Sequence, residues 1–210
     1  MCADQRRALE VSDIGNLLCE TEKASSCGSL PIELQTTKNI FALMFLLRGI
    51  PFVDLAYLRK ADIQGNTLKY RRRKTGRLLT VMLTPDAIKL IRIVAKTKPE
   101  SPYLFPFLSS PEGTEAAYHE YQSSLRMFNY RLSRLKKYMK TAAHLSSYTI
   151  RHTWATMAYY CEIHPGIISE AMGHSSIKVT ETYLKPFQNE KIDNANSQVI
   201  SYVKEYASIV

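Results

Sequence analysis

Residues that can perform acid, base or nucleophilic chemistry gather in three short segments of the 210-residue chain. The segments are RRRKTGR (71–77), SYTIRHTWAT (147–156) and GHSSIKVTETY (173–183). Together they supply arginine forks that bind phosphate oxygens, a lysine and histidines that can move protons, and a tyrosine that can act as a nucleophile. Breaking a phosphodiester needs such a set: cations around the non-bridging oxygens, an in-line nucleophile and a proton for the leaving oxygen.

Each segment also has an ordinary structural explanation. An arginine-rich hairpin usually presents a solvated face, and an Arg-His pair on a helix is more often structural than catalytic. A histidine after a helix-ending glycine is usually a capping or surface residue. These three explanations are independent of one another, so the combination of segments favours a chemical site where a single segment would not.

The combination resembles the tyrosine recombinases, also called the phage integrase family. SYTIRHTWATMA is similar to the family's H-x-x-R-H-T-x-A-T box. AMGHSSIKVTETYL is similar to its L-G-H box, and Tyr183 follows His174 at the family's spacing. RRRKTG resembles the hairpin segment that carries the family's lysine, and LLRGIPFVDLAYLRKADI resembles the first arginine box. The resemblance covers roughly residues 7–190.

This resemblance implies a role for each matching residue. Tyr183 matches the nucleophile, Arg151 the second arginine of the set, His174 the third-box histidine and Lys74 the hairpin lysine. The implied reaction cleaves and rejoins DNA through a 3′-phosphotyrosine on Tyr183. It requires no cofactor, metal or ATP, because the tyrosyl ester retains the energy of the broken bond.

Two positions depart from the family pattern. Tyr148 stands where the second box usually has histidine; a phenol can hydrogen-bond a phosphate, but its reference pKa of about 10 makes it a poorer proton shuttle near pH 7. Pro51 stands where the first arginine is expected, although Asp54 keeps the carboxylate position. Arg48 lies three residues earlier, about 4.5 Å of helical rise, which its side chain can span. Arg59, or an arginine of the hairpin, is the competing substitute.

Hydrophobic periodicity and turn residues predict the elements that position these segments. Residues 61–84 predict a small antiparallel meander with one basic face, because Leu68 and Tyr70 alternate with Lys69 and Arg71. Gly173 is expected to allow a chain reversal before the last site segment. The expected fold class is mostly α with a small antiparallel β-sheet (α+β), which is also the tyrosine-recombinase catalytic-domain fold. Helices are expected over 5–22, 36–48, 51–58, 85–96, 115–141, within 144–164, over 165–172 and over 176–184, and the segment 97–114 is expected to be an ordered loop.

Composition limits the partners and the compartment. The net charge of +9 fits a polyanionic partner, and a hydrophobic content of 45% allows a real core. We found no apolar run long enough to span a membrane and no signal-peptide core, which predicts a cytoplasmic, nucleoid-associated protein with no membrane partner. The four cysteines, Cys2, Cys19, Cys27 and Cys161, lack metal-ligand spacing. Candidate DNA contacts, mostly to phosphates, are Arg71, Arg72, Arg73 and Arg77 of the hairpin, Lys60, and Arg134 of the long helix.

The expected domain organisation follows the resemblance. Residues 1–190 are expected to form the catalytic domain, and the N-terminal core-binding domain usual in the family is expected to be absent from this chain. Residues 191–210 are expected to form a tail that is exchanged between protomers or packs on its own chain. The implied partner is double-stranded DNA, bound as a homotetramer on two sites by the full-length protein, with this piece of it monomeric.

Two other functions remain open from the sequence. PGIISEAMGHSSIKVTETYLK has helix-turn-helix spacing, which would suit a noncatalytic or catalytically impaired DNA-binding regulator. A type IB topoisomerase would use the same tyrosine chemistry to relax supercoils. A regulator, however, has no need for Lys74, Arg151, His174 and Tyr183 together.

Overall fold

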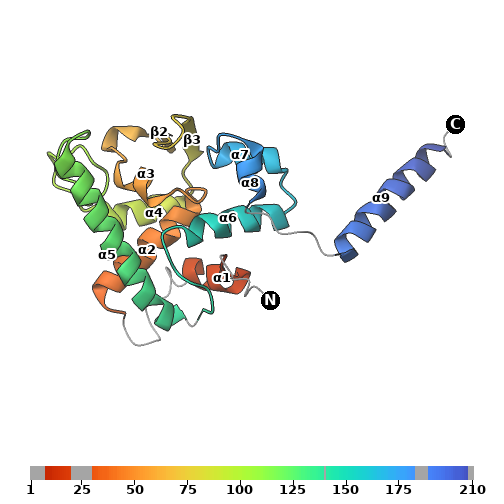
Figure 1. The fold of residues 1–210 in the computed structure, drawn as a ribbon, viewed down its shortest axis with the longest axis horizontal. Coiled ribbons are helices and arrows are strands. Elements are labelled where there is room, and N and C mark those ends of the chain that lie inside the picture. Colours follow the sequence, from red (N-terminus) through yellow and green to blue (C-terminus); the bar gives the residue numbers. More distant parts are fainter. Residues whose placement is uncertain (1–7, 20–29, 140, 183–188, 208–210) are drawn as a thin grey trace.

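A computed structural model (Figure 1) describes residues 8–19, 30–139, 141–182 and 189–207. Within these residues the chain is mostly helical with one small sheet, so the predicted fold class is confirmed. The helices are α1 (Val11–Cys19), α2 (Ile32–Leu46), α3 (Phe52–Ala56), the 3₁₀ turn η1 (Lys60–Asp62), α4 (Pro85–Val94), α5 (Glu115–Met139), α6 (Thr149–Tyr160), α7 (Pro165–Ala171), α8 (Ile177–Glu181) and α9 (Asn189–Ala207). The strands are β1 (Ile63–Gln64), β2 (Thr67–Arg71) and β3 (Leu78–Met82).

Helix α2 forms the centre of the main core. Its sequence is apolar around most of its circumference, so it is stable only when other helices cover it on several sides. It contacts α1, α4, α5 and α6, and Phe41, Leu43 and Met44 are fully buried. The long helix α5 packs along one side of this body (Figure 1).

The three strands form an antiparallel sheet in the order β1-β2-β3. Tyr70 pairs with Leu79 and Leu68 with Val81, so these four side chains share one face. All four are buried, whereas Lys69 and Arg71 are exposed, as the predicted alternation requires. Figure 1 shows β2 and β3 beside α7, which brings the hairpin next to a segment about a hundred residues later in the chain.

A second, smaller apolar cluster joins α6 to α7. It contains Ala155, Ala158, Ile168 and Met172, with Trp154 packed against it. Helix α9 stands apart from the rest of the molecule in Figure 1. Lys191 Nζ of α9 forms an ion pair with Glu162 Oε1, 3.2 Å away.

Some helix boundaries differ from the sequence prediction at positions where the helix propensity of the side chains only weakly determines where the helix begins or ends. Helix α2 begins at Ile32, four residues before the predicted start, because Pro31 is its N-cap and the carbonyl of Pro31 already accepts from Leu34 and Gln35. Helix α8 ends at Glu181 and is N-capped by Ser176, without a side-chain hydrogen bond. In the part of the chain that the structure describes, none of the helices combines the length and apolarity that crossing a membrane requires.

Candidate functional site

The stretch that resembles the first arginine box contains the sharp turn between α2 and α3. Arg48 and Gly49 both have left-handed backbone angles, with φ of 59° and 66°. A Cβ on Gly49 would lie 3.0 Å from the Cα of Arg151 and 3.2 Å from the Cβ of Trp154, so glycine is required for close approach as well as for its φ. Pro51 is buried and is the N-cap residue of α3. The position where an arginine was expected is therefore a helix start, with no charge of its own.

Arg151 connects this turn to the third site segment. The side chain comes from the first turn of α6 and is 2% exposed. Its Nη1 donates to the carbonyl of Gly49 at 2.9 Å, and its Nη2 donates to the carbonyl of Met172 at 2.7 Å. A charged group this deeply buried needs hydrogen bonds on its nitrogens, and these two carbonyls supply them.

His174 follows the helix-ending Gly173, whose φ of 65° confirms the predicted chain reversal. The imidazole is 4% exposed, and its Nδ1 lies 2.8 Å from Thr180 Oγ1 of α8. The pKa of His174 is lowered to about 4, first by burial and then by the positive charges of Arg151, Arg72 and Lys74. His174 is therefore a neutral imidazole near pH 7.

The hairpin turn contacts the same segment from the other side. Thr75 Oγ1 donates to the carbonyl of Gly173 at 3.0 Å, and Arg77 Nη1 donates to the carbonyl of His174 at 2.7 Å. Lys74 directly precedes Thr75 at the tip of the turn and is exposed. These contacts hold the predicted hairpin lysine near the predicted histidine, as its effect on the His174 pKa also shows.

Arg72 differs from its sequence prediction. It was expected on an exposed DNA-binding face, but it is 4% exposed and its Nη1 donates to Asp54 Oδ2 at 2.7 Å. The other oxygen of Asp54 accepts from the backbone N–H of Arg73 at 3.0 Å. The alternation of β2 contains the missed signal, because Arg72 follows Leu68 and Tyr70 at a spacing of two and so continues the buried face.

Tyr70 belongs to the main core, and the charges of several residues of the site act on it. Its side chain is 7% exposed. Burial raises the pKa of Tyr70 and Asp54 raises it further, whereas the positive charges of Arg151, Arg72 and Arg48 oppose the rise. Tyr70 thus lies among three arginines from three different segments. Arg48 itself is half-buried, and its guanidinium has no hydrogen-bond or ion-pair partner among the described residues.

Of the two tyrosines predicted for the site, the structure describes Tyr148 but not Tyr183. Tyr148 is the N-cap residue of α6 and is 49% exposed, with its ring centroid 6.2 Å from that of His152. It is therefore open to an approaching ligand. Tyr183, the predicted nucleophile, lies outside the described residues, directly after the range 141–182 that contains α8.

The remaining DNA-binding candidates are surface or half-buried cations with different partners. Arg71 Nη1 donates to the carbonyl of Gly76 at 3.1 Å. Arg73 pairs with Glu112 and lies over the ring of Tyr57, 3.7 Å from its centroid. Lys60 Nζ donates to two loop carbonyls, and Arg134 Nη1 lies 3.3 Å from Glu33 Oε1. Each pair is exposed enough for water, or a phosphate, to compete with it.

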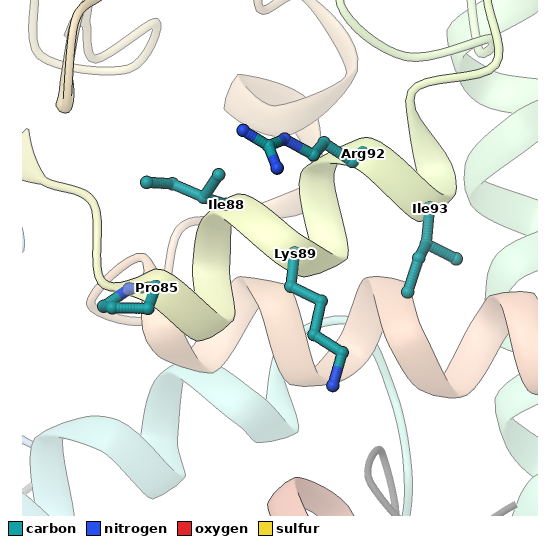
Figure 2. A pocket seen from close by; sticks show the side chains of 5 residues that line it. All are labelled: Pro85, Ile88, Lys89, Arg92 and Ile93. Atoms are coloured by element: carbon teal, nitrogen blue, oxygen red, sulfur yellow. The ribbon is translucent and has the colours of Figure 1, made fainter.

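The pocket in Figure 2 has no part in this cluster. It is an open hollow along α4, lined by Pro85, Ile88, Lys89, Arg92 and Ile93. None of these five residues is a predicted site residue. Among the described residues, no group of three or more His, Cys, Asp or Glu side chains is placed to hold a metal ion.

The sequence model of the phage integrase family matches residues 13–190. This match spans most of the chain, so the protein belongs to the phage integrase family, the tyrosine recombinases. No curated protein matches the chain.

Solved structures of recombinases share the fold. A crystal structure of XerA recombinase is 16% identical, with a TM-score of 0.60 over 91% of this chain and 64% of that one. XerH site-specific recombinase bound to its difH substrate before cleavage is 16% identical, with a TM-score of 0.63 over 94% and 55%. The Tn1549 transposon integrase with circular intermediate DNA is 14% identical, with a TM-score of 0.64 over 94% and 67%. The chain thus spans about half to two thirds of the length of these proteins.

Proposed function

We propose that this protein is the catalytic domain of a site-specific DNA recombinase that cleaves and rejoins DNA through a 3′-phosphotyrosine on Tyr183. One observation carries the proposal. Arg151, His174 and the Lys74 hairpin, from three distant parts of the sequence, meet around the backbone of residues 172–174. Helix α8 and the hydroxyl of Thr180 then connect His174 to the segment that contains Tyr183.

The proposed reaction is a transesterification. The phenol oxygen of Tyr183 forms a bond to the phosphorus and gives up its proton, for which neutral His174 is the proposed acceptor. The bond from phosphorus to the 5′ oxygen breaks, and the ammonium of Lys74 gives a proton to that oxygen. Arg151 donates to the non-bridging oxygens and stabilises the charge of the transition state, an effect commonly worth several kcal/mol. The reverse sequence rejoins the strand, so no metal, ATP or other co-reactant is consumed.

Two sequence-predicted residues complete the proposed machinery. Tyr148, exposed beside the site, takes the place of the second-box histidine and donates its hydroxyl to the phosphate. Arg48 is the sequence-predicted source of a second guanidinium. Its charge acts on Tyr70 together with the charge of Arg151, which supports a position at the edge of the site.

Binding is proposed to use the cations around the site. Arg71, Arg73 and Arg77 of the hairpin flank Lys74, while Lys60 and Arg134 extend the basic surface over other elements. The structures of XerH and of the Tn1549 integrase contain DNA, which supports DNA as the partner. In the full-length protein we propose a homotetramer on two DNA sites, with α9 exchanged between protomers, and a place of action at the nucleoid.

The decisive experiment is covalent capture. A library of nicked duplexes with randomised sequence is incubated with the protein, because a nick next to the cleavage site lets the short 5′-hydroxyl strand diffuse away and prevents rejoining. Wild-type protein should form a covalent complex that survives denaturation, and sequencing the captured DNA identifies the site. Tyr183→Phe should abolish capture while the salt dependence of binding stays nearly unchanged.

The matched control is Tyr160→Phe, which removes an exposed phenol at the end of α6 and should capture DNA normally. Covalent capture by Tyr183→Phe would overturn the nucleophile assignment. Salt-dependent binding without capture by the wild-type protein would instead indicate a DNA-binding regulator. Relaxation of a supercoiled plasmid without joining of two sites would indicate a topoisomerase.

A further inference from the structure

Arg72 has more hydrogen-bonding capacity than its surroundings use. A buried guanidinium is costly unless its nitrogens are paired. Among the residues that the structure describes, only Nη1 of this side chain is paired, with Asp54 Oδ2 at 2.7 Å. The buried Nε has no hydrogen-bond partner among the described residues. Nη2 has none among these residues either. Asp54 therefore holds Nη1 of the fork, while the other side-chain N–H groups have no acceptor among the described residues.

Arg72 also lies beside the segment that leads to His174. A Cβ on Gly173 would lie 3.4 Å from the Cδ of Arg72, so the side chain passes directly beside the third site segment. Its charge lowers the pKa of His174 together with the charges of Arg151 and Lys74. The same charge acts on Tyr70 together with Arg151. Arg72 is thus near both the predicted site histidine and the predicted site arginine.

The site lacks a second guanidinium at the expected place. Pro51 occupies that position, and Arg151 uses both terminal nitrogens to hold the carbonyls of Gly49 and Met172. A phosphodiester transition state spreads negative charge over its non-bridging oxygens, and a single guanidinium with two of its N–H groups engaged by carbonyls has fewer donors left for them. Arg48 is a candidate for the missing charge, but it lies half-buried at the α2–α3 turn.

We propose that Arg72 is a catalytic residue that binds the scissile phosphate in place of the missing first-box arginine, with Asp54 as its positioning residue. This inference rests on the proposed function. Asp54 fixes the fork through Nη1, so that Nε and Nη2 donate to a non-bridging oxygen opposite Arg151. The backbone N–H of Arg73 holds the second carboxylate oxygen and keeps the carboxylate in that orientation.

The test compares two versions of the captured DNA site. One carries the normal scissile phosphate, and the other carries a methylphosphonate, in which a neutral methyl group replaces one charged non-bridging oxygen. Arg72→Ala should slow covalent capture of the normal substrate by about 100-fold or more, the usual effect of losing one transition-state donor. On the methylphosphonate it should capture at close to the wild-type rate, because there is no longer a charge for Arg72 to neutralise.

The comparison separates chemistry from folding. A variant whose fold is impaired loses the same factor on both substrates, and that result would show that the ion pair to Asp54 is only structural. Arg48→Ala is measured in parallel; relief by methylphosphonate for Arg48→Ala but not for Arg72→Ala would also overturn the proposal. Arg92→Ala, at an exposed arginine of α4, is the matched control and should behave as wild type on both substrates.

Two further variants keep the test valid if Arg72→Ala unfolds because Asp54 is left as a buried, unpaired charge. Arg72→Lys retains the charge but loses the fork, and it should capture the normal substrate at least about 10-fold slower than wild type. The double variant Asp54→Asn with Arg72→Met removes both charges and should fold, yet it should capture only the methylphosphonate well. Wild-type capture of neither substrate would overturn the proposed function itself, and with it the role of Arg72.

Discussion

At the residue scale, His174 shows how burial sets the charge of a site residue. Its imidazole lies against Thr180 and near three cations, Arg151, Arg72 and Lys74. With a folded-state pKa of about 4 and an unfolded value of about 6.5, it binds fewer protons folded than unfolded between these two pH values. Stability must therefore fall as pH is lowered through this window.

We predict that this one residue costs about 2 kcal/mol of unfolding free energy between pH 7 and pH 5. Urea unfolding of wild type and of His174→Gln at pH 7, 6 and 5 measures it, since glutamine does not titrate. The loss of stability should be about 2 kcal/mol smaller in the variant. Equal pH dependence in the two proteins would contradict the prediction. The pKa of Glu120 is lowered to about 2, so this carboxylate titrates mainly below pH 5. It therefore contributes little to the difference in stability between pH 7 and pH 5.

At the element scale, the α2–α3 turn and α6 are in direct backbone contact. Gly49 has φ of 66°, and the space beside its Cα is taken by Arg151 and Trp154. Gly65, in the β1–β2 turn, has φ of 59°, but a Cβ added there would have nothing within 4 Å of it. The two glycines share the same backbone strain on substitution and differ only in the room available.

Gly49→Ala should therefore destabilise the protein more than Gly65→Ala. The left-handed backbone costs about 1 kcal/mol in both variants. The forced contact with α6 should add about 1–3 kcal/mol to Gly49→Ala and displace Arg151, which lowers covalent capture as well. Urea midpoints and capture rates of the two variants test this. Similar midpoints would mean that α6 can move away from the turn without cost.

The elements also show what a sequence can and cannot predict here. The hairpin, the long helix and the Gly173 reversal were predictable because strand alternation, helical periodicity and glycine are local signals. Arg151, His174 and Lys74 were predictable as a group from their motifs, and the structure brings them together. Arg72 was misplaced because its neighbours in sequence are exposed arginines, and only the packing of α3 against the hairpin brings Asp54 to it.

At the scale of the whole molecule, α9 is the element with the least attachment. Its Ile192, Val199, Ile200, Tyr202 and Val203 are exposed. The ion pair from Lys191 to Glu162 is on the surface and contributes at most about 1 kcal/mol. The core around α2 is complete without it.

Removal of residues 189–210 should therefore change the unfolding free energy of the remaining body by less than about 1 kcal/mol. Trp154, the single tryptophan of the chain, lies in the cluster between α6 and α7 and reports unfolding by fluorescence without a signal from α9. Leu132→Ala, a fully buried core change in α5, is the positive control, with an expected loss of about 2–5 kcal/mol. A loss of that size on truncation would show that α9 packs on its own chain.

The two hydrogen bonds of Arg151 have a consequence for biosynthesis. One accepting carbonyl lies 102 residues before the guanidinium and the other 21 residues after it. During translation, Gly49 leaves the ribosome before Arg151, and Met172 leaves it afterwards. A nascent or truncated chain that ends before this point has a buried arginine with one of its two supports missing. Both supports of Arg151 are therefore present only in a chain that extends past Met172, and a shorter chain cannot hold this guanidinium as the complete fold does.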